Sequence, residues 1–452
     1  MNKMVVACVQ QRLRLHADTE ECRKDLTRFL RSAQAKRAKL IVFPELIGTL
    51  AVAPLLPGVR ARLLRQADQA HRPRASLWTR AKGRVAESTA GVLRADFRQD
   101  LSKQLSEDPS VAWTSFRTLF SDVAREHDMT VVAGSGYVFD DEIGGLANQA
   151  VVFGPDGQIL GRQVKVSLSE DDEPLALAGR GWATIDTPVG RIGILMGNDA
   201  LYPEAGRLLA YEGATMLLGL GACSGDRMHH KVRAGLLARV QENELYGMVS
   251  FLVGRNPIGM SDRHELAGQS AILAPSDFTP GGTGVMVQLG TTSSEGVITA
   301  EWDFTALQEL WTGGETRLRQ AMPMASFRPL GGRYLEERTL QSVWDAPPYV
   351  APALPLPEAP EIGAPEIGAP ETEAPAETLQ PDAMPLLPDV VSVDMLPEIA
   401  AAEAEPLPAD LSMPEPSWMK DADEADVADA IVEELLAEES LTQIDGEDSA
   451  TL

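Results

Sequence analysis

The sequence predicts an α/β domain followed by a long acidic tail, and two observations support this prediction. Short apolar runs, such as KMVVACV at 3–9 and KLIVF at 39–43, alternate with longer segments of helical period. Such alternation is typical of α/β folds. Residues 346–452 contain 26 Asp and Glu but one basic residue, Lys420, so nearly all of the net charge of −26 belongs to this tail.

The elements of the domain are expected in a simple order. The first strand at 3–9 precedes a helix at 19–35, in which Leu26, Phe29 and Leu30 share one face. The strand at 39–43 ends at Pro44-Glu45, where open α/β sheets usually place their functional groups. Further on we expect a helix at 111–127, strands at 130–133 and up to 138, a hairpin of 150–153 and 158–166, a strand at 191–196, a helix at 203–211, a strand at 214–219, a helix at 230–246, and strand-rich stretches at 248–254, 268–274 and 284–304.

Residues 51–110 are interpreted as a helical, basic insertion. Between 58 and 84 there are eight Arg or Lys residues and His71, against the single acid Asp68. A basic run of this kind is most often a solvated surface. Docking of the acidic tail is a second interpretation. Nucleic-acid binding is disfavoured, because only Trp78 offers a stacking aromatic ring there.

The tail itself divides into two parts. Residues 346–420 hold all 17 of the tail's prolines and two EIGAP repeats, and we expect a disordered linker because such a segment buries too little apolar surface. In 421–441, proline is absent and apolar residues recur at Val427, Ile431 and Leu435 on an acidic background. This spacing predicts an acidic amphipathic helix that docks on a protein partner.

Several classes of protein are excluded or disfavoured by composition. Three cysteines do not form a disulfide framework, and the six histidines lack the spacing of metal ligands, so we expect no metal and no cofactor. No segment approaches the roughly 18 apolar residues of a membrane span. We expect a cytoplasmic protein that does not enter a membrane.

Residues 191–204, RIGILMGNDALYPE, are typical of a strand that turns sharply into a helix. Such an elbow displays one side chain beside the unpaired N–H groups of the helix, which suits a nucleophile. Here the displayed position is Gly197, and no Cys, Ser or Thr occurs between 188 and 214.

Four segments in order resemble the nitrilase, or carbon–nitrogen hydrolase, superfamily: FPE at 43–45, KVSL at 165–168, GILMGNDALYPE at 193–204 and ARVQEN at 238–243. The resemblance covers about 3–305, with 51–110 as an insertion, and assigns 1–345 to one domain. It implies a four-layer α-β-β-α sandwich and assembly into a homo-oligomer. In that family a Glu is the general base, a Lys stabilises the oxyanion and a Cys forms a thioester.

The resemblance places Glu45 at the general base, Lys165 at the oxyanion group and Glu173 at an additional glutamate of many members. Gly197 falls on the nucleophilic cysteine. A thiol needs a neighbouring base at neutral pH, and an ammonium offsets charge on the tetrahedral intermediate. Binding roles beside these residues are predicted for three more positions, Asn198, Asp199 and Cys223.

The leading hypothesis is a nitrilase-like domain that has lost hydrolysis and acts as a binding or scaffold protein. One alternative is an amidase-type hydrolase that uses Cys223 or an activated water. Another is a sensor that binds a small amide or carboxylate between Glu45 and Lys165 without turnover. Those two side chains can also persist purely as a structural ion pair, since deleting one would strand the other.

Overall fold

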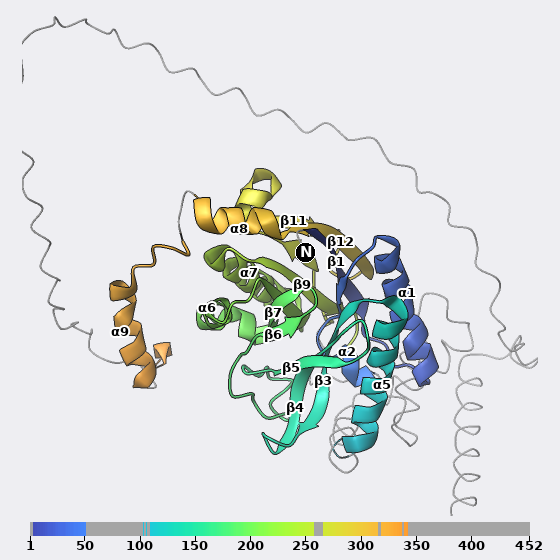
Figure 1. The fold of residues 1–452 in the computed structure, drawn as a ribbon. Coiled ribbons are helices and arrows are strands. Elements are labelled where there is room, and N and C mark those ends of the chain that lie inside the picture. The colour runs from blue at the N-terminus through green and yellow to red at the C-terminus, as the bar shows by residue number, and fades with distance from the viewer. Residues whose placement is uncertain are drawn as a thin grey trace, which may run out of the picture. The chain divides into compact units, whose positions relative to one another are not determined.

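Two mixed β-sheets pack face to face at the centre of the fold (Figure 1). The first has the strand order β5-β4-β3-β2-β1, with β12 antiparallel to β1, and the second has the order β9-β8-β7-β6, with β10 and β11 beyond β9. The end of β1 pairs with the end of β9 and joins the two sheets. The strands are β1 (Lys3–Arg12), β2 (Leu40–Val42), β3 (Thr130–Asp140), β4 (Gly145–Phe153), β5 (Ile159–Val164), β6 (Ile185–Thr187), β7 (Gly190–Met196), β8 (Met216–Ala222), β9 (Tyr246–Val253), β10 (Ala271–Leu273), β11 (Val285–Gln288) and β12 (Gly296–Asp303).

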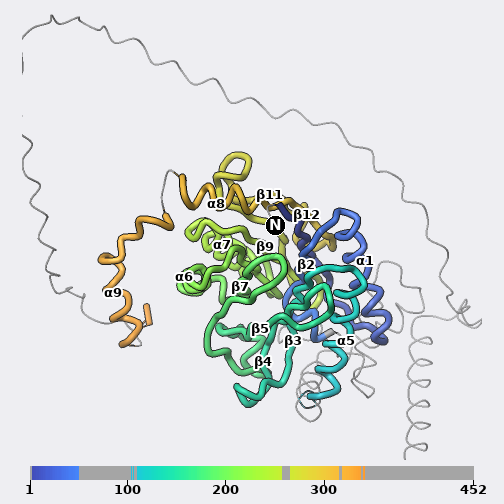
Figure 2. Tube along the Cα trace, in the orientation of Figure 1, coloured from blue at the N-terminus to red at the C-terminus, as the bar shows by residue number. Residues whose placement is uncertain are grey.

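Helices cover the outer face of each sheet. The first sheet packs against α1 (Thr19–Ala35) and α5 (Pro109–His127), and the second against α6 (Pro203–Tyr211) and α7 (Asp226–Asn243). The chain trace shows these pairs on opposite sides of the strands (Figure 2). The predicted four-layer α-β-β-α sandwich is therefore confirmed. Among the described residues up to Met322, the other helices are α2 (Ile47–Leu50), η2 (Gly197–Leu201), η3 (Ser276–Phe278), η4 (Pro280–Gly282) and α8 (Phe304–Gly313).

The apolar core lies in three layers, because each sheet is buried on both faces. Between the sheets, alternate residues of β1 and β2 meet alternate residues of β7 and β8. This explains why these strands read as continuous apolar runs in the sequence. The inter-sheet layer includes Val6, Cys8, Leu40, Val42, Ile192, Ile194, Met196, Leu218 and Leu220.

The computed structural model describes residues 3–50, 103, 105, 109–256, 265–314, 318–336 and 339–341. Its residues up to Met322 form one unit, and α9 (Met324–Leu335) belongs to a second. Nearly all of the predicted insertion, the linker 346–420 and the acidic helix 421–441 lie outside the described residues.

Most elements occur where the sequence predicts them, and the differences are local. Helix α7 begins four residues before the predicted start, at Asp226, and ends at Asn243 because Glu244 adopts a left-handed conformation with φ of 48°. The two expected strands at 130–138 are one strand, β3, with a bulge that includes Gly134. At this bulge, the backbone of β3 at Gly134 lies close to Pro44 and Ile47.

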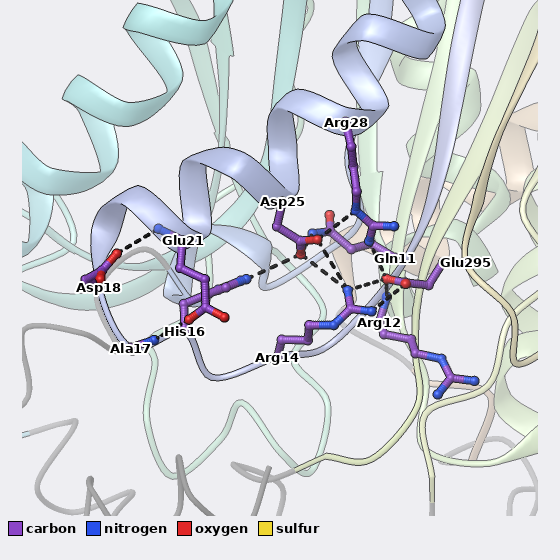
Figure 3. Close-up of polar contacts among 10 residues, drawn as sticks. All are labelled: Gln11, Arg12, Arg14, His16, Ala17, Asp18, Glu21, Asp25, Arg28 and Glu295. Atoms are coloured by element: carbon purple, nitrogen blue, oxygen red, sulfur yellow. Dashed lines mark hydrogen bonds and ion pairs between the residues drawn. The ribbon is translucent and has the colours of Figure 1, made fainter. Parts of the chain in front are cut away.

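A polar cluster fixes the loop that follows β1 (Figure 3). Asp25 of α1 accepts hydrogen bonds from Gln11, Arg14 and Arg28. Glu295, next to β12, binds both terminal nitrogens of Arg14 at 2.6 and 2.5 Å and Arg28 at 2.8 Å. These contacts hold β1 and β12 to α1, and so fix the strand that joins the two sheets.

Candidate functional site

Glu45 lies just beyond the carboxyl end of β2 and is 2% exposed. The residue after it, Leu46, has a φ of 64°, an unfavourable value for a non-glycine residue, and its N–H donates to the Ser135 hydroxyl at 3.0 Å. Gly134 makes this turn possible, because a β-carbon there would lie 2.0 Å from the Pro44 carbonyl oxygen. The bulge of β3 therefore accommodates the turn that directs Glu45 inward.

Lys165 follows the last residue of β5, and its ammonium lies between two carboxylates. Its Nζ is 2.6 Å from Glu45 Oε1 and 2.6 Å from Asp172 Oδ2. All three side chains are no more than 3% exposed. The structure thus brings together the two residues that the sequence motif predicts as base and oxyanion group, which are 120 residues apart.

The second acid beside Lys165 is Asp172, which sequence reasoning missed. Glu173, the residue predicted for this place, is exposed and lies outside the buried network. Asp172 also accepts the Tyr137 hydroxyl at 2.9 Å and both the N–H and hydroxyl of Ser169. The Ser169-x-x-Asp172 spacing is the sequence signal that could have found it, because a Ser and an acid three residues apart readily form reciprocal turn contacts.

A buried amide bridges the two acids. Asn148 of β4 donates through Nδ2 to Glu45 Oε1 and to Asp172 Oδ1, at 3.0 Å each. Its role was not predicted from the sequence, because β4 reads as an ordinary apolar strand. Glu45, Lys165, Asp172 and Asn148 therefore form a closed ring of hydrogen bonds.

Burial and charge determine the protonation of this ring. Burial raises the pKa of Glu45, although Lys165 acts in the opposite direction. Burial alone would lower the pKa of Lys165, but the Glu45 and Asp172 carboxylates outweigh it and hold that pKa above its usual value. For Asp172, burial is outweighed by Lys165 and by Ser169, which lower its pKa to about 2. Lys165 and Asp172 are therefore charged at neutral pH, and Glu45 is the group closest to gaining a proton.

Gly197 faces this ring from the elbow between β7 and η2. Its φ is 49°, a conformation that glycine adopts at little cost. A β-carbon there would lie 3.2 Å from Lys165 Nζ and 3.3 Å from Glu45 Oε2. A side chain at this position would thus contact both the carboxylate and the ammonium.

Asn198 and Asp199, for which binding roles are predicted, hold the loop that carries Lys165. The Asp199 carboxylate accepts the N–H of Ser167 at 2.7 Å and that of Met196 at 3.3 Å, and Asn198 donates to the Leu168 carbonyl at 2.9 Å. Asp199 is fully buried, and burial raises its pKa. These contacts fix the Lys165 loop to the elbow.

Cys223 follows β8 and is 3% exposed in the apolar layer between the second sheet and its helices. Burial raises the pKa of its thiol far above the usual value, and the negative charge of Glu45 adds to this effect. The preceding residue, Ala222, donates its N–H to Glu45 Oε2 at 3.0 Å. Within the described part of the chain, the donors to Glu45 are Lys165, Asn148 and this N–H, and none of them is a thiol or hydroxyl group.

The sequence that builds these two sheets and the elbow matches a protein-family model. The family model described as carbon-nitrogen hydrolase matches residues 5–311. The chain belongs to the carbon-nitrogen hydrolase family. The match includes Glu45, Lys165 and Gly197, and it spans both sheets and all four covering helices.

Named relatives of the chain include both bacterial and animal proteins. The chain is 29% identical over 225 residues to "Probable hydrolase YhcX" of Bacillus subtilis, a match that covers 49% of this chain and 43% of that protein. It is 31% identical over 111 residues to human "Omega-amidase NIT2", with coverage of 23% and 40%. These matches span less than half the length of either relative.

A solved structure supports the fold. The carbon-nitrogen hydrolase from Helicobacter pylori G27 aligns with a TM-score of 0.51 at 18% identity, covering 73% of this chain and 98% of that one. At this identity the likeness concerns the fold alone.

Two further properties follow from the described residues. No group of three or more His, Cys, Asp or Glu among them is arranged to hold a metal ion. No described helix is both long and apolar enough to cross a membrane.

Proposed function

We propose that this protein is a carbon-nitrogen hydrolase family member that has lost covalent hydrolysis and acts as a binding or scaffold component. The observation that carries the proposal is Gly197. Its α-carbon occupies the place from which a side chain would contact both Glu45 and Lys165, and glycine supplies no nucleophile. Base and ammonium are retained, but the group that they would activate is absent.

The rival hydrolase that uses Cys223 has less support. A thiolate attacks far more readily than a thiol, and burial keeps the Cys223 thiol protonated. Its side chain packs in the apolar layer behind the second sheet, with Val232 and Val253 in the same cluster. Reaction there would require the chain to expose this sulfur to a substrate.

Ligand binding without turnover is a second candidate function, and the hydrogen-bonding capacity that Lys165 and Glu45 retain within the described part of the chain favours it. Among the described residues, Lys165 Nζ donates to Glu45 and Asp172, which leaves the third hydrogen of the ammonium for another acceptor. Within the same residues, the donor to Glu45 Oε2 is the Ala222 N–H. Both atoms lie within 3.3 Å of the position that a β-carbon of residue 197 would take, so a small polar ligand can contact both there.

The decisive experiment compares the wild-type chain with Gly197→Cys. Ammonia release from a panel of primary amides is measured, because named relatives include omega-amidases. We expect no turnover by the wild-type chain and measurable turnover by Gly197→Cys that disappears when Glu45→Gln is added. Gly197→Ala is the matched control, since it adds the β-carbon without the sulfur.

Two results would count against the proposal. Turnover by the wild-type chain that is lost in Cys223→Ala would establish the rival thiol route. Turnover that persists in Cys223→Ala but is lost in Glu45→Gln would establish hydrolysis by an activated water.

We also propose that the chain forms a homo-oligomer, as its family resemblance implies. Four large apolar side chains are exposed along η2, α6 and the residue between them, namely Leu201, Tyr202, Leu208 and Tyr211, at 36%, 48%, 43% and 61%. Sedimentation velocity of the wild-type chain and of Leu208→Glu tests this surface. A monomeric wild-type chain would refute the proposal. The cytoplasmic location and the docking of 421–441 on a partner stay predictions from the sequence.

A further inference from the structure

A groove of about 410 Å³ lies between α5 and the start of β5 (Figure 1). It is lined by five residues of α5 between Arg117 and Arg125, and by Gly157, Gln158 and Ile159 of the β4–β5 hairpin. None of these residues contributes to the ring around Lys165. The groove is therefore a surface distinct from that centre.

Hydrogen bonds fix the two walls of the groove against each other. The Ser121 hydroxyl donates to the Gly157 carbonyl at 2.7 Å, and a β-carbon on Gly157 would lie 2.7 Å from the Ser121 carbonyl oxygen. Arg125 donates to Ser121 Oγ, to the Asp122 carboxylate and to the Asp156 carbonyl. A guanidinium has five N–H groups, so two remain for another acceptor. The groove is thus preformed, and it retains donors.

The groove carries excess positive charge. Arg125 is offset by Asp122 at 3.2 Å, but Arg117 is exposed and makes no ion pair or hydrogen bond among the described residues. The Arg162 guanidinium lies 4.3 Å above the ring of Trp113, which is one helical turn before Arg117 on α5. Arg162 therefore adds a second cation without an anionic partner, within the described residues, at this end of the groove.

The acidic tail, residues 346–452, offers a charge and a spacing that fit this groove. A Pro-Glu dipeptide recurs every five residues, at 360–361, 365–366 and 370–371. Proline favours an extended polyproline II conformation of ~3.1 Å per residue, which places successive glutamates of these repeats ~15 Å apart. Arg117 and Arg125 are two turns apart, or ~12 Å along α5. One repeat therefore spans the groove.

The tail is long enough to bring these repeats to the groove of its own chain. Residues 336–361, which follow α9, span up to ~85 Å when extended. The four layers of the sandwich measure about 30 Å between the axes of opposite outer helices. A tethered segment has an effective concentration on the order of 0.1–1 mM, so a few surface ion pairs suffice to hold it.

We propose that the Pro-Glu repeats at 360–371 bind in the α5–β5 groove of their own chain. One glutamate lies beside Arg117 and Arg162, and the next lies near Arg125. This surface differs from the basic insertion 51–110. The inference goes beyond the proposed function, because it does not depend on whether the chain hydrolyses a substrate.

The test measures the distance between two spin labels in the full-length chain by double electron–electron resonance. One label is attached through Thr114→Cys, an exposed position one turn before the groove, and the other through Gly368→Cys in the second repeat. The three native cysteines are buried and stay in place. We expect a narrow population of distances within about 30 Å, which is one repeat length plus the two label arms.

Two pairs of substitutions on the folded domain test the role of charge. Arg117→Glu with Arg162→Glu should reduce the short-distance population about fivefold or more, because both cations become repulsive. Arg227→Glu with Lys231→Glu is the matched control, since it reverses two exposed cations of α7 and should leave the population unchanged.

A tail variant tests the other partner without altering the folded domain. It replaces the three glutamates that follow proline in the repeats: Glu361→Gln, Glu366→Gln and Glu371→Gln. It should cause the same loss as the double arginine variant. Its control removes three acids of the predicted helix at 421–441, and should have no effect: Asp421→Asn, Asp423→Asn and Glu424→Gln.

Four results would overturn the inference. They are the absence of the short-distance population in the wild-type background, its persistence after Arg117→Glu with Arg162→Glu, its persistence in the tail variant, and an equal loss in the α7 control. A mixture of the two singly labelled chains should give no short distances. If it gives them, the repeats bind a second copy, and the assignment to their own chain is wrong.

Discussion

Replacement of Lys165 by Met should destabilise the folded unit strongly at neutral pH and weakly in mild acid. The substitution keeps the length of the side chain but removes the ammonium that lies 2.6 Å from both Glu45 and Asp172. Removing one partner of a buried ion pair costs ~3–5 kcal/mol, because the other charge is left unpaired. Asp172 keeps donors from Tyr137, Asn148 and Ser169, so Glu45 is the group that must respond.

The size of the loss follows from the proton that Glu45 can take up. Protonating a carboxyl of ordinary pKa costs about 1.4 kcal/mol per pH unit above that pKa, or ~4 kcal/mol at pH 7 and ~1 kcal/mol at pH 5. A protonated, neutral Glu45 can stay buried without the Lys165 ammonium. The cost of protonating Glu45 is therefore the largest amount by which its unpaired charge can destabilise the variant. We therefore expect Lys165→Met to lose ~4 kcal/mol of unfolding free energy at pH 7 and ~1 kcal/mol at pH 5.

Urea unfolding followed by tryptophan fluorescence at both pH values measures this difference. Lys39→Met is the control, because Lys39 pairs with Asp128 at 3.0 Å on the exposed surface, where such pairs contribute ~0–1 kcal/mol. Addition of Glu45→Gln to Lys165→Met should recover most of the loss at pH 7. A loss below 1 kcal/mol at pH 7, or an equal loss at pH 5, would refute the reasoning.

Three other predictions concern backbone, thiols and acid. Gly134→Ala should lower the unfolding free energy by more than ~3 kcal/mol in thermal unfolding, because the new β-carbon would lie 2.0 Å from the Pro44 carbonyl oxygen. The control Gly144→Ala has a φ of 79° but open space around it, so it should cost only ~1 kcal/mol, and equal losses in the two variants would contradict the steric argument. The three cysteines are all buried, so a thiol reagent should label none of them within minutes in the native chain and all three in urea. Labelling of Cys223 within minutes in the native chain would instead support hydrolysis through the Cys223 thiol. The pKa of Asp172 is lowered to about 2 in the folded chain, so the stabilisation by its carboxylate is present above the pKa of the unfolded chain, near 4, and is lost as pH falls toward 2. The unfolding free energy should therefore decline less steeply between pH 5 and pH 2 in Asp172→Asn than in the wild-type chain, and an equal slope would exclude this contribution of Asp172 to acid sensitivity.

Local sequence patterns predicted most elements because their signals are short-range. Helix α1 spans 19–35 as its apolar spacing indicates, and the hairpin turns at Gly157, whose φ is 77°. The predicted and observed boundaries of an element differ where the backbone conformation of one residue ends it, as the left-handed Glu244 ends α7. The four-layer arrangement came from the resemblance, since periodicity alone does not say which faces of two sheets meet.

From the sequence alone, the resemblance to the carbon-nitrogen hydrolase family assigned Glu45 and Lys165 to one site, and the flanking residues fixed Gly197 as the residue that the elbow displays. Only the tertiary structure decided which neighbours complete the site. Asp172 and Glu173 are adjacent acids in one turn, yet the first is buried against Lys165 and the second is exposed. Asn148 bridges carboxylates that are 103 and 24 residues away in the chain. Such partners depend on how distant segments pack, and on the cost of burying a charge without one, which no local pattern records.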